Sequence, residues 1–195
     1  MSNIFFCSDL HFGHNQPFLY EGRGFSSIEE HDEMIVERHN SLVKPNDIVY
    51  CLGDIMLNNN KTGMEHFNRL NGNFYIIIGN HDTDVRIKTY QKTLGTWING
   101  VHQLKSVDWG NRFTHKKKEF FLSHFPSLVV NEHMRKPVFN IHGHQHDTVH
   151  FHSYIPNGYE VSLDTNNCYP ISFDTILEDL KTYKERFDLY ENFYI

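Results

Sequence analysis

The sequence predicts an α/β fold, built around a largely parallel sheet that other layers cover on both faces. Through the first half of the chain, short and continuously apolar runs alternate with helical patterns, and such runs are typical of strands buried on both faces. The length of 195 residues favours a single domain over 1–195, because one domain commonly holds about 150 residues. A domain of this size buries about 70% of the surface of its unfolded chain and needs no disulfide or structural metal for stability.

The first half of the chain predicts three strands and two helices in alternation. The strands are the apolar runs Ile4–Cys7, Ile48–Leu52 and Phe74–Ile78. A first helix is expected to open at Ser26, which has capping-box spacing to Glu29, and to end before Pro45. A second, short helix is marked by apolar residues at helical spacing: Met64, Phe67 and Leu70.

The second half of the chain has a different pattern, with shorter apolar runs. Three of them look like meander strands: Val101–Leu104, Phe113–His115 and Glu119–Leu122. Two further strands are expected: Val138–Ile141 and Val161–Leu163. The chain then enters an amphipathic helix with Ser172 as its N-cap and an apolar face made of Ile176, Leu177, Leu180, Tyr183 and Phe187.

Composition excludes several classes of protein. No run approaches the ~18 apolar residues of a membrane span, and Asp9 comes too early for a signal peptide, so a cytoplasmic location is expected. The net charge of −6 argues against a broad nucleic-acid surface. The three cysteines are far apart and form no C-x-x-C pair, so they are expected to be buried, reduced thiols: Cys7, Cys51 and Cys168.

The most unusual feature is histidine, with 15 of 195 residues, and several histidines stand with acidic residues directly after predicted strands. Ligands bind outside the carboxyl ends of strands in open α/β sheets. Carboxylate, amide and imidazole groups without thiolates suit Mn²⁺, Fe, Zn²⁺, Co²⁺ or Ni²⁺. Seven such ligands exceed what one tetrahedral ion needs and fit two ions, with Asp54 expected as the bridge. The seven are Asp9, His11, Asp54, Asn80, His124, His144 and His146.

Five short blocks contain these ligands, and their order is informative. They are DLH from Asp9, GD at 53–54, GNHD at 79–82, a lone His124 after a strand, and GHQH at 143–146. Together they resemble the calcineurin-like metallophosphoesterase superfamily, and in particular its small, capless members common in bacteria and phages. The resemblance implies a four-layer α/β/β/α sandwich of two mixed sheets, a dinuclear metal centre, and a bacterial or phage-infected cell as the setting.

The resemblance also implies a role for each residue. One ion would be held by Asp9, His11, Asp54 and His146. The other would be held by Asp54, Asn80, His124 and His144. A hydroxide bridging the two ions would attack phosphorus. His81 would contact the phosphate and assist the leaving oxygen, and Asp82 would orient His81.

The function expected from this resemblance is a metal-dependent phosphohydrolase, with a phosphodiesterase favoured because the short chain leaves no room for a cap. The alternatives are a phosphomonoesterase acting on protein or nucleotide phosphates, and a non-catalytic scaffold of the same fold. The expected cofactors are two divalent ions, with Mn²⁺ the first choice in vitro. The expected partner is a nucleotide or other phosphate-ester substrate. Extended nucleic-acid or membrane binding is not indicated, and the sequence does not indicate an oligomeric state.

Residues near the five blocks carry weaker expectations. His14 and Arg23 could reach the phosphate or only pack their loop, and the two interpretations weigh equally. The segment Leu163–Asn167 is expected to orient metal ligands.

The remaining histidines are expected not to bind metal. His142 is expected to be packed beside the site. His150 and His152 are expected on a solvated edge strand in preference to a metal-scavenging tract. The others are His31 and His39, on a helix that looks solvated, and His66, His102, His115 and His133.

Overall fold

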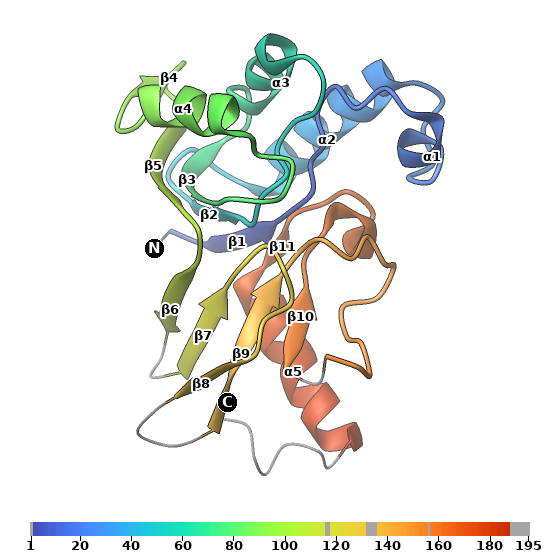
Figure 1. Cartoon of the computed structure of the whole chain (residues 1–195), viewed down its shortest axis with the longest axis vertical. Coiled ribbons are helices and arrows are strands. Elements are labelled where there is room, and N and C mark those ends of the chain that lie inside the picture. The colour runs from blue at the N-terminus through green and yellow to red at the C-terminus, as the bar shows by residue number, and fades with distance from the viewer. Residues whose placement is uncertain (1, 116–117, 132–135, 156, 188–195) are drawn as a thin grey trace.

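Two mixed β-sheets pack against one another at the centre of the molecule, and helices cover them (Figure 1). The computed structural model describes residues 2–115, 118–131, 136–155 and 157–187, without the side chains of 130, 131, 136, 137 and 184–187. The α/β fold of two mixed sheets predicted from the sequence is confirmed. His133 and the side chain of Phe187 lie outside the described part.

The first sheet has six strands in the order β11-β1-β2-β3-β5-β4. Its parallel centre consists of β1 (Ile4–Cys7), β2 (Ile48–Cys51), β3 (Gly72–Ile77) and β5 (His102–Asp108). Its antiparallel edges are β11 (Ile171–Ser172) and β4 (Trp97–Ile98). The meander prediction was wrong for β5, which pairs in parallel with β3. The intervening helix α4 (Asp84–Lys92) supplies the crossover that a parallel connection needs.

The second sheet has five strands, four of them in the order β10-β9-β7-β6. The expected hairpin is confirmed as β6 (Asn111–His115) and β7 (Lys118–Leu122). Parallel to β7 runs β9 (Lys136–His142), which is flanked by β10 (Gly158–Glu160) and β8 (Val129–Asn131). Strand β10 lies three residues before the predicted strand Val161–Leu163. At Ser162 the chain instead bridges to Ser8 and links the two sheets.

The helices begin at defined caps. Helix α2 (Ile28–Leu42) begins one residue later than predicted, because Ser27 and not Ser26 accepts the Glu30 N–H. Ser172 caps α5 (Phe173–Phe187) as expected, accepting the Thr175 N–H. Two further helices are α1 (Pro17–Tyr20) and α3 (Asn60–Phe67). Within the described ranges, no helix combines the length and the apolar composition that crossing a membrane requires.

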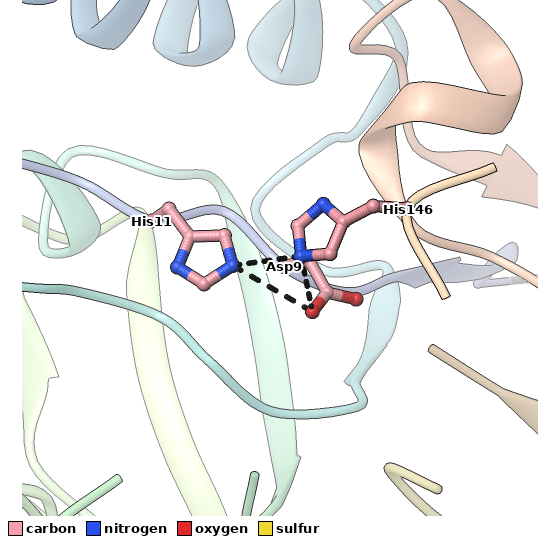
Figure 2. A group of neighbouring side chains, drawn as sticks. All are labelled: Asp9, His11 and His146. Atoms are coloured by element: carbon pink, nitrogen blue, oxygen red, sulfur yellow. Dashed lines mark hydrogen bonds and ion pairs between the residues drawn. The ribbon is translucent and has the colours of Figure 1, made fainter. Parts of the chain in front are cut away.

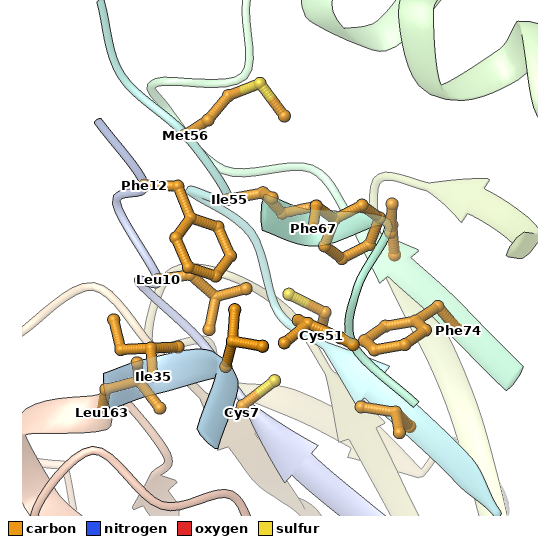
Figure 3. Close-up of a cluster of buried hydrophobic side chains, with 14 of the residues drawn as sticks. Cys7, Leu10, Phe12, Ile35, Cys51, Ile55, Met56, Phe67, Phe74 and Leu163 are labelled. Atoms are coloured by element: carbon orange, nitrogen blue, oxygen red, sulfur yellow. The ribbon is translucent and has the colours of Figure 1, made fainter. Parts of the chain in front are cut away.

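The apolar core lies on both faces of the first sheet. On one face, side chains of β1, β2 and β3 pack against α2 and α3 (Figure 3). All three cysteines are free and buried in this cluster, as predicted. On the other face, Phe6 packs on Phe113 of the second sheet and on Phe173 of α5. The strands are thus clamped by apolar contacts on both faces, which leaves their carboxyl ends to carry polar groups.

Two histidines of α2 differ from the sequence prediction of a solvated helix. His31 and His39 are 0% and 2% exposed. Each ring has internal partners, because His39 Nε2 lies 2.9 Å from the Asn71 carbonyl and His31 Nδ1 lies 2.8 Å from Asp32 Oδ1. Hydrogen bonds make the burial of these polar rings acceptable.

Candidate metal centre

Loops after β1, β2 and β3 and after β7 and β9 meet at the carboxyl ends of the strands, as predicted. The loops after β1 and β2 are joined by backbone hydrogen bonds of 3.0 Å, from Asp9 N–H to Gly53 O and from His11 N–H to Asp54 O. Gly53 is required at this junction, since its φ is +98° and a Cβ there would lie 2.6 Å from the Gly79 nitrogen.

Strained backbone is concentrated at these loops. Five of the seven predicted ligands have positive φ, between 52° and 78°: Asp9, His11, Asp54, His144 and His146. Non-glycine residues rarely adopt this region, and such strain persists only where surrounding contacts hold the residue in place. The clustering of strain is a common property of functional sites.

Asp9, His11 and His146 form the first group of converging ligand atoms (Figure 2). Asp9 Oδ1 lies 3.7 Å from His11 Nε2 and 3.4 Å from His146 Nε2, and the two nitrogens lie 3.1 Å apart. Asp9 is 0% exposed, and its Oδ1 has no hydrogen-bond partner. A buried carboxylate oxygen without a partner is costly unless a cation neutralises it. The group therefore fits a divalent ion.

Asp54, His124 and Asn80 form a second group beside the first. His124 Nε2 lies 3.4 Å from Asp54 Oδ2 and 2.8 Å from Asn80 Oδ1. His124 Nδ1 lies 2.7 Å from the Leu52 carbonyl oxygen, which fixes the tautomer that leaves Nε2 free to bind. His144 stands next to this group, its ring centroid 5.1 Å from that of His124. The second group also has the donor types that a transition-metal ion prefers.

Two carboxylates are candidates for the shared ligand. Asp9 belongs to both sets of atoms that lie within 4.8 Å of one another, one with His11 and His146 and the other with Asp54 and His124. Asp54, the predicted bridge, accepts the His81 N–H at 2.8 Å with Oδ1, and its Oδ2 lies 3.4 Å from His124 Nε2. A carboxylate oxygen that accepts one hydrogen bond keeps a second lone pair for a metal, so both carboxylates remain candidates.

Protonation of the histidines differs sharply within the site. Burial, reinforced by the charge of Arg23, lowers the pKa of His11 well below its usual value. Burial opposes protonation of His124, but its hydrogen bond to Asp54 and the charges of Asp9 and Asp54 raise its pKa to about 9. Asp164 and Asp9 likewise raise the pKa of His146 despite its burial. In the metal-free protein, protons thus neutralise carboxylates that a cation would neutralise, and metal uptake should release protons.

His81 stands at the edge of both groups with its side chain 45% exposed. Its Nε2 lies 4.0 Å from Asp54 Oδ2, and its ring meets that of His11 edge-on at 5.6 Å. Asp54 accepts its backbone N–H, and Arg86 donates to its carbonyl. The backbone of His81 is therefore fixed while its imidazole remains accessible.

Asp82 does not contact the His81 ring, so the predicted orienting contact is corrected. The Asp82 carboxylate is 4% exposed and accepts the N–H groups of Asp54 and Gly79 at 2.9 Å each, and the Tyr90 hydroxyl at 2.7 Å. Burial raises the pKa of this carboxyl. Asp82 joins the ends of β2 and β3 and acts on Asp54 instead of on the imidazole.

A cavity of about 590 Å³ adjoins the first group of ligands. His11, His81 and His146 line it, together with Phe18 and Leu163. His14 also lines the cavity, with its ring 5.6 Å from that of Phe18, and its contact with a substrate stays a prediction. Arg23 lines the cavity as well, but its side chain is 1% exposed and hydrogen-bonded to protein groups, which favours packing of its loop, one of the two alternatives weighed from the sequence.

Other polar groups support the site, and only some of them were predicted from the sequence. Asp164, in the segment expected to orient ligands, accepts from His146 Nδ1 at 2.9 Å. His142 is buried beside the site as expected. His152 is not on a solvated edge strand, because it is 5% exposed and lies 2.6 Å from the carboxylate of buried Glu160. His150 Nδ1 meets the Glu160 carbonyl at 2.8 Å, so this ring is also held internally.

Arg86 and Tyr90 were missed because they lie on α4, whose polar sequence has little apolar periodicity. Asp82 of the GNHD block was the only indication of such partners, because a buried carboxylate needs hydrogen-bond donors.

Comparison with known proteins identifies a matching family model and relatives in an archaeon and a phage. A family model described as calcineurin-like phosphoesterase matches residues 2–190. An uncharacterized protein of Methanocaldococcus jannaschii is 30% identical over 184 residues, which cover 91% of each chain. The gene 66 protein of Mycobacterium phage L5 is 29% identical over 168 residues, covering 75% of this chain and 78% of the phage protein.

A solved structure supports the same fold. A protein of unknown function from Aquifex aeolicus superposes with a TM-score of 0.66 at 20% identity, covering 92% of this chain and 100% of the other. At this identity the likeness concerns the arrangement of helices and strands alone.

Proposed function

The chain belongs to the calcineurin-like phosphoesterase family, and from that premise we propose that it is a divalent-metal-dependent phosphohydrolase that prefers phosphodiesters. The observation that carries the proposal is the convergence of two ligand groups that share Asp9, beside a cavity and an accessible imidazole. Structural proteins of the same fold would not need His81 to remain accessible at that position.

The proposed cofactors are two divalent ions, with Mn²⁺ as the first to be assayed. The first ion would be held by the Asp9 group, and the second by the Asp54 group with His144, with either Asp9 or Asp54 shared between them. When bound, the ions supply Lewis acidity at the phosphoryl oxygens and activate water. The full proposed ligand set is the one expected from the sequence: Asp9, His11, Asp54, Asn80, His124, His144 and His146.

His81 is the proposed general acid. Its backbone is anchored at the N–H by Asp54 and at the carbonyl by Arg86, so the ring projects from a fixed point. The exposed ring can approach a leaving oxygen and donate a proton as the ester bond breaks. Asp82 contributes indirectly, by holding the Asp54 backbone through a buried hydrogen bond of 2.9 Å.

The cavity supports a diester over a monoester. A diester carries one charge and two organic groups, so it requires space beside the phosphate. The cavity of about 590 Å³ is lined by His81 and His146 among others and can receive one of these groups. A monoester dianion would favour an additional free cation, but the arginine that lines the cavity is already paired with Asp164.

The test compares bis-p-nitrophenyl phosphate with p-nitrophenyl phosphate. The protein is treated with EDTA, reloaded with Mn²⁺ and assayed with both compounds. We expect activity only after reloading, with a higher kcat/KM for the diester than for the monoester. A higher value for the monoester would establish a phosphomonoesterase, and no turnover of either compound would favour a non-catalytic scaffold.

Two variants show that the activity belongs to this protein. Asp9→Asn is expected to abolish turnover, because it removes the charge common to both ligand groups. Asp174→Asn, an exposed carboxylate in the first turn of α5, is the matched control and should retain full activity. Activity that survives Asp9→Asn would indicate a contaminating phosphatase.

A further inference from the structure

Arg23 and Asp164 form a buried ion pair beside the Asp9–His11–His146 group. We propose that this pair is a positioning device that sets the geometry of this metal group, and that Arg23 does not bind substrate. The inference rests on the proposed metal role of Asp9, His11 and His146. It assigns a role to Arg23 that goes beyond the two alternatives weighed from the sequence, a phosphate contact and packing of its loop.

All five N–H groups of Arg23 have partners. Nε and Nη2 donate to the two oxygens of Asp164 at 3.0 and 2.8 Å, and Nη2 also donates to the Asp9 carbonyl at 2.8 Å. Nη1 donates to the Leu10 carbonyl at 3.4 Å and lies 3.0 Å from His31 Nε2. A guanidinium has five N–H donors, so a phosphate could bind Arg23 only after one of these contacts breaks.

Asp164 extends the contact to the other side of the metal group. Its Oδ2 accepts from His146 Nδ1 at 2.9 Å as well as from Arg23. A carboxylate on the remote nitrogen of a metal-binding histidine fixes the tautomer and the ring orientation. His146 Nε2 is thereby directed at Asp9 Oδ1, 3.4 Å away.

The pair connects loops that belong to different sheets. Asp9 follows β1 of the first sheet and His146 follows β9 of the second, and both have positive φ. Neither loop sets the distance between these two ligands alone. Arg23 holds the Asp9 backbone and, through Asp164, the His146 ring. It therefore sets the distance between Asp9 and His146.

A second arm of the network holds the far end of the same loop. His31 bridges Arg23 to Asp32, with its Nδ1 2.8 Å from Asp32 Oδ1. Asp32 Oδ2 then accepts the Gly13 N–H at 2.9 Å. The strained segment from Asp9 to Gly13, which includes His11, is therefore held at both ends by groups that trace back to Arg23.

The test measures metal binding without substrate. Calorimetric titration of the metal-free protein with Mn²⁺ is performed for wild type and for Arg23→Lys, which retains the charge but cannot bind Asp164 in a bidentate manner. The affinity of the ion held by His11 and His146 should fall by ~10- to 100-fold, the range for loss of groups that support metal ligands. The other ion, whose ligand group also includes Asp9, should weaken less. The visible spectrum of the Co²⁺-loaded variant should change chiefly for the ion held by His11 and His146.

Kinetics separate positioning from substrate binding. At saturating Mn²⁺, Arg23→Lys should lower kcat for the diester and leave KM within about twofold. A raised KM with unchanged metal affinity would overturn the proposal in favour of a phosphate contact. Equal weakening of both ions, accompanied by general destabilisation, would overturn it in favour of a purely structural role.

Two further variants keep the result interpretable. Asp164→Asn provides a second route if Arg23→Lys does not fold, and it should weaken the same ion. Arg69→Lys is the matched control, because Arg69 makes a bidentate pair with Glu33 at the surface and should leave both ions unaffected. A wild type that binds no ion would overturn the proposed function, whereas two ions bound unchanged by Arg23→Lys would overturn only the positioning role.

Discussion

Gly143 provides a steric test of the site, because its missing side chain leaves room for Asp9. A Cβ at this position would lie 2.6 Å from Asp9 Oδ2 and still closer to Ser8 Oγ, whereas real Cβ contacts essentially never fall below 3.0 Å. In Gly143→Ala, Asp9 must therefore move by at least 3.0 − 2.6 = 0.4 Å or its loop must shift. Productive metal geometry tolerates about 0.5 Å, so the added methyl alone uses most of this tolerance.

The expected result has a binding part and a stability part. Mn²⁺ affinity, measured by calorimetry, should fall by ~10- to 100-fold, because the perturbation acts on the support of a ligand. The free energy of unfolding of the metal-free protein, measured in urea, should fall by about 1–3 kcal/mol from overpacking.

The control for Gly143→Ala is Gly95→Ala. Gly95 has φ +74° with nothing within 4 Å of an added Cβ, so the variant should lose ~1–2 kcal/mol of stability to backbone strain and no metal affinity. Unchanged Mn²⁺ affinity in Gly143→Ala would refute the placement of Asp9 at the metal.

Three further predictions concern other parts of the structure. His81→Asn should lower kcat for the diester by ~10²- to 10⁴-fold while calorimetry shows unchanged metal binding, and equal loss of metal would refute the proton-donor role. Tyr90→Phe should lower the free energy of unfolding in urea by ~1.5–3 kcal/mol, since it removes the 2.7 Å hydrogen bond to buried Asp82; no loss relative to Tyr75→Phe would contradict this. Burial lowers the pKa of His39 and of His102 to about 4. Near pH 6.5 these two histidines therefore bind protons in the unfolded chain but not in the folded protein. Stability should therefore decline as the pH falls from about 6.5 to 4, and urea titrations of His39→Gln should show a shallower decline than wild type.

The sequence predicted those ligands that come directly after a recognisable apolar strand. Asp9, Asp54 and His124 each follow an apolar run of three to five residues, and parallel strands bring their carboxyl ends to one edge. Local sequence therefore carried enough information to place these ligands together. It did not indicate that Asp9 belongs to both sets of converging ligand atoms, since this depends on how the loops after β1, β2, β7 and β9 meet in three dimensions.

The supporting network could not be predicted in the same way. Arg23 and Asp164 are 141 residues apart in sequence, and nothing in either segment shows that they meet. Arg23 in an isolated loop has the composition of an anion-binding residue, and only its complete set of internal partners shows otherwise. The burial of His152 against Glu160 was missed for a similar reason, because alternation with Phe151 suggested a solvated strand where a buried hydrogen bond exists.

The fold shows the same division between local and non-local information. The strands β1, β2 and β3 were predictable because they are continuously apolar. The parallel pairing of β5 was not, because α4 presents a polar sequence whose two buried side chains, Arg86 and Tyr90, face the site. A functional requirement thus obscured the pattern by which this crossover helix would have been recognised.

Diester turnover measured during a stoichiometric metal titration tests the dinuclear centre directly. Metal-free protein is titrated with Mn²⁺ while hydrolysis of bis-p-nitrophenyl phosphate is followed. We expect no turnover without metal and activity that rises until two equivalents are bound. Turnover that is complete at one equivalent, or that persists in EDTA, would contradict a dinuclear phosphodiesterase.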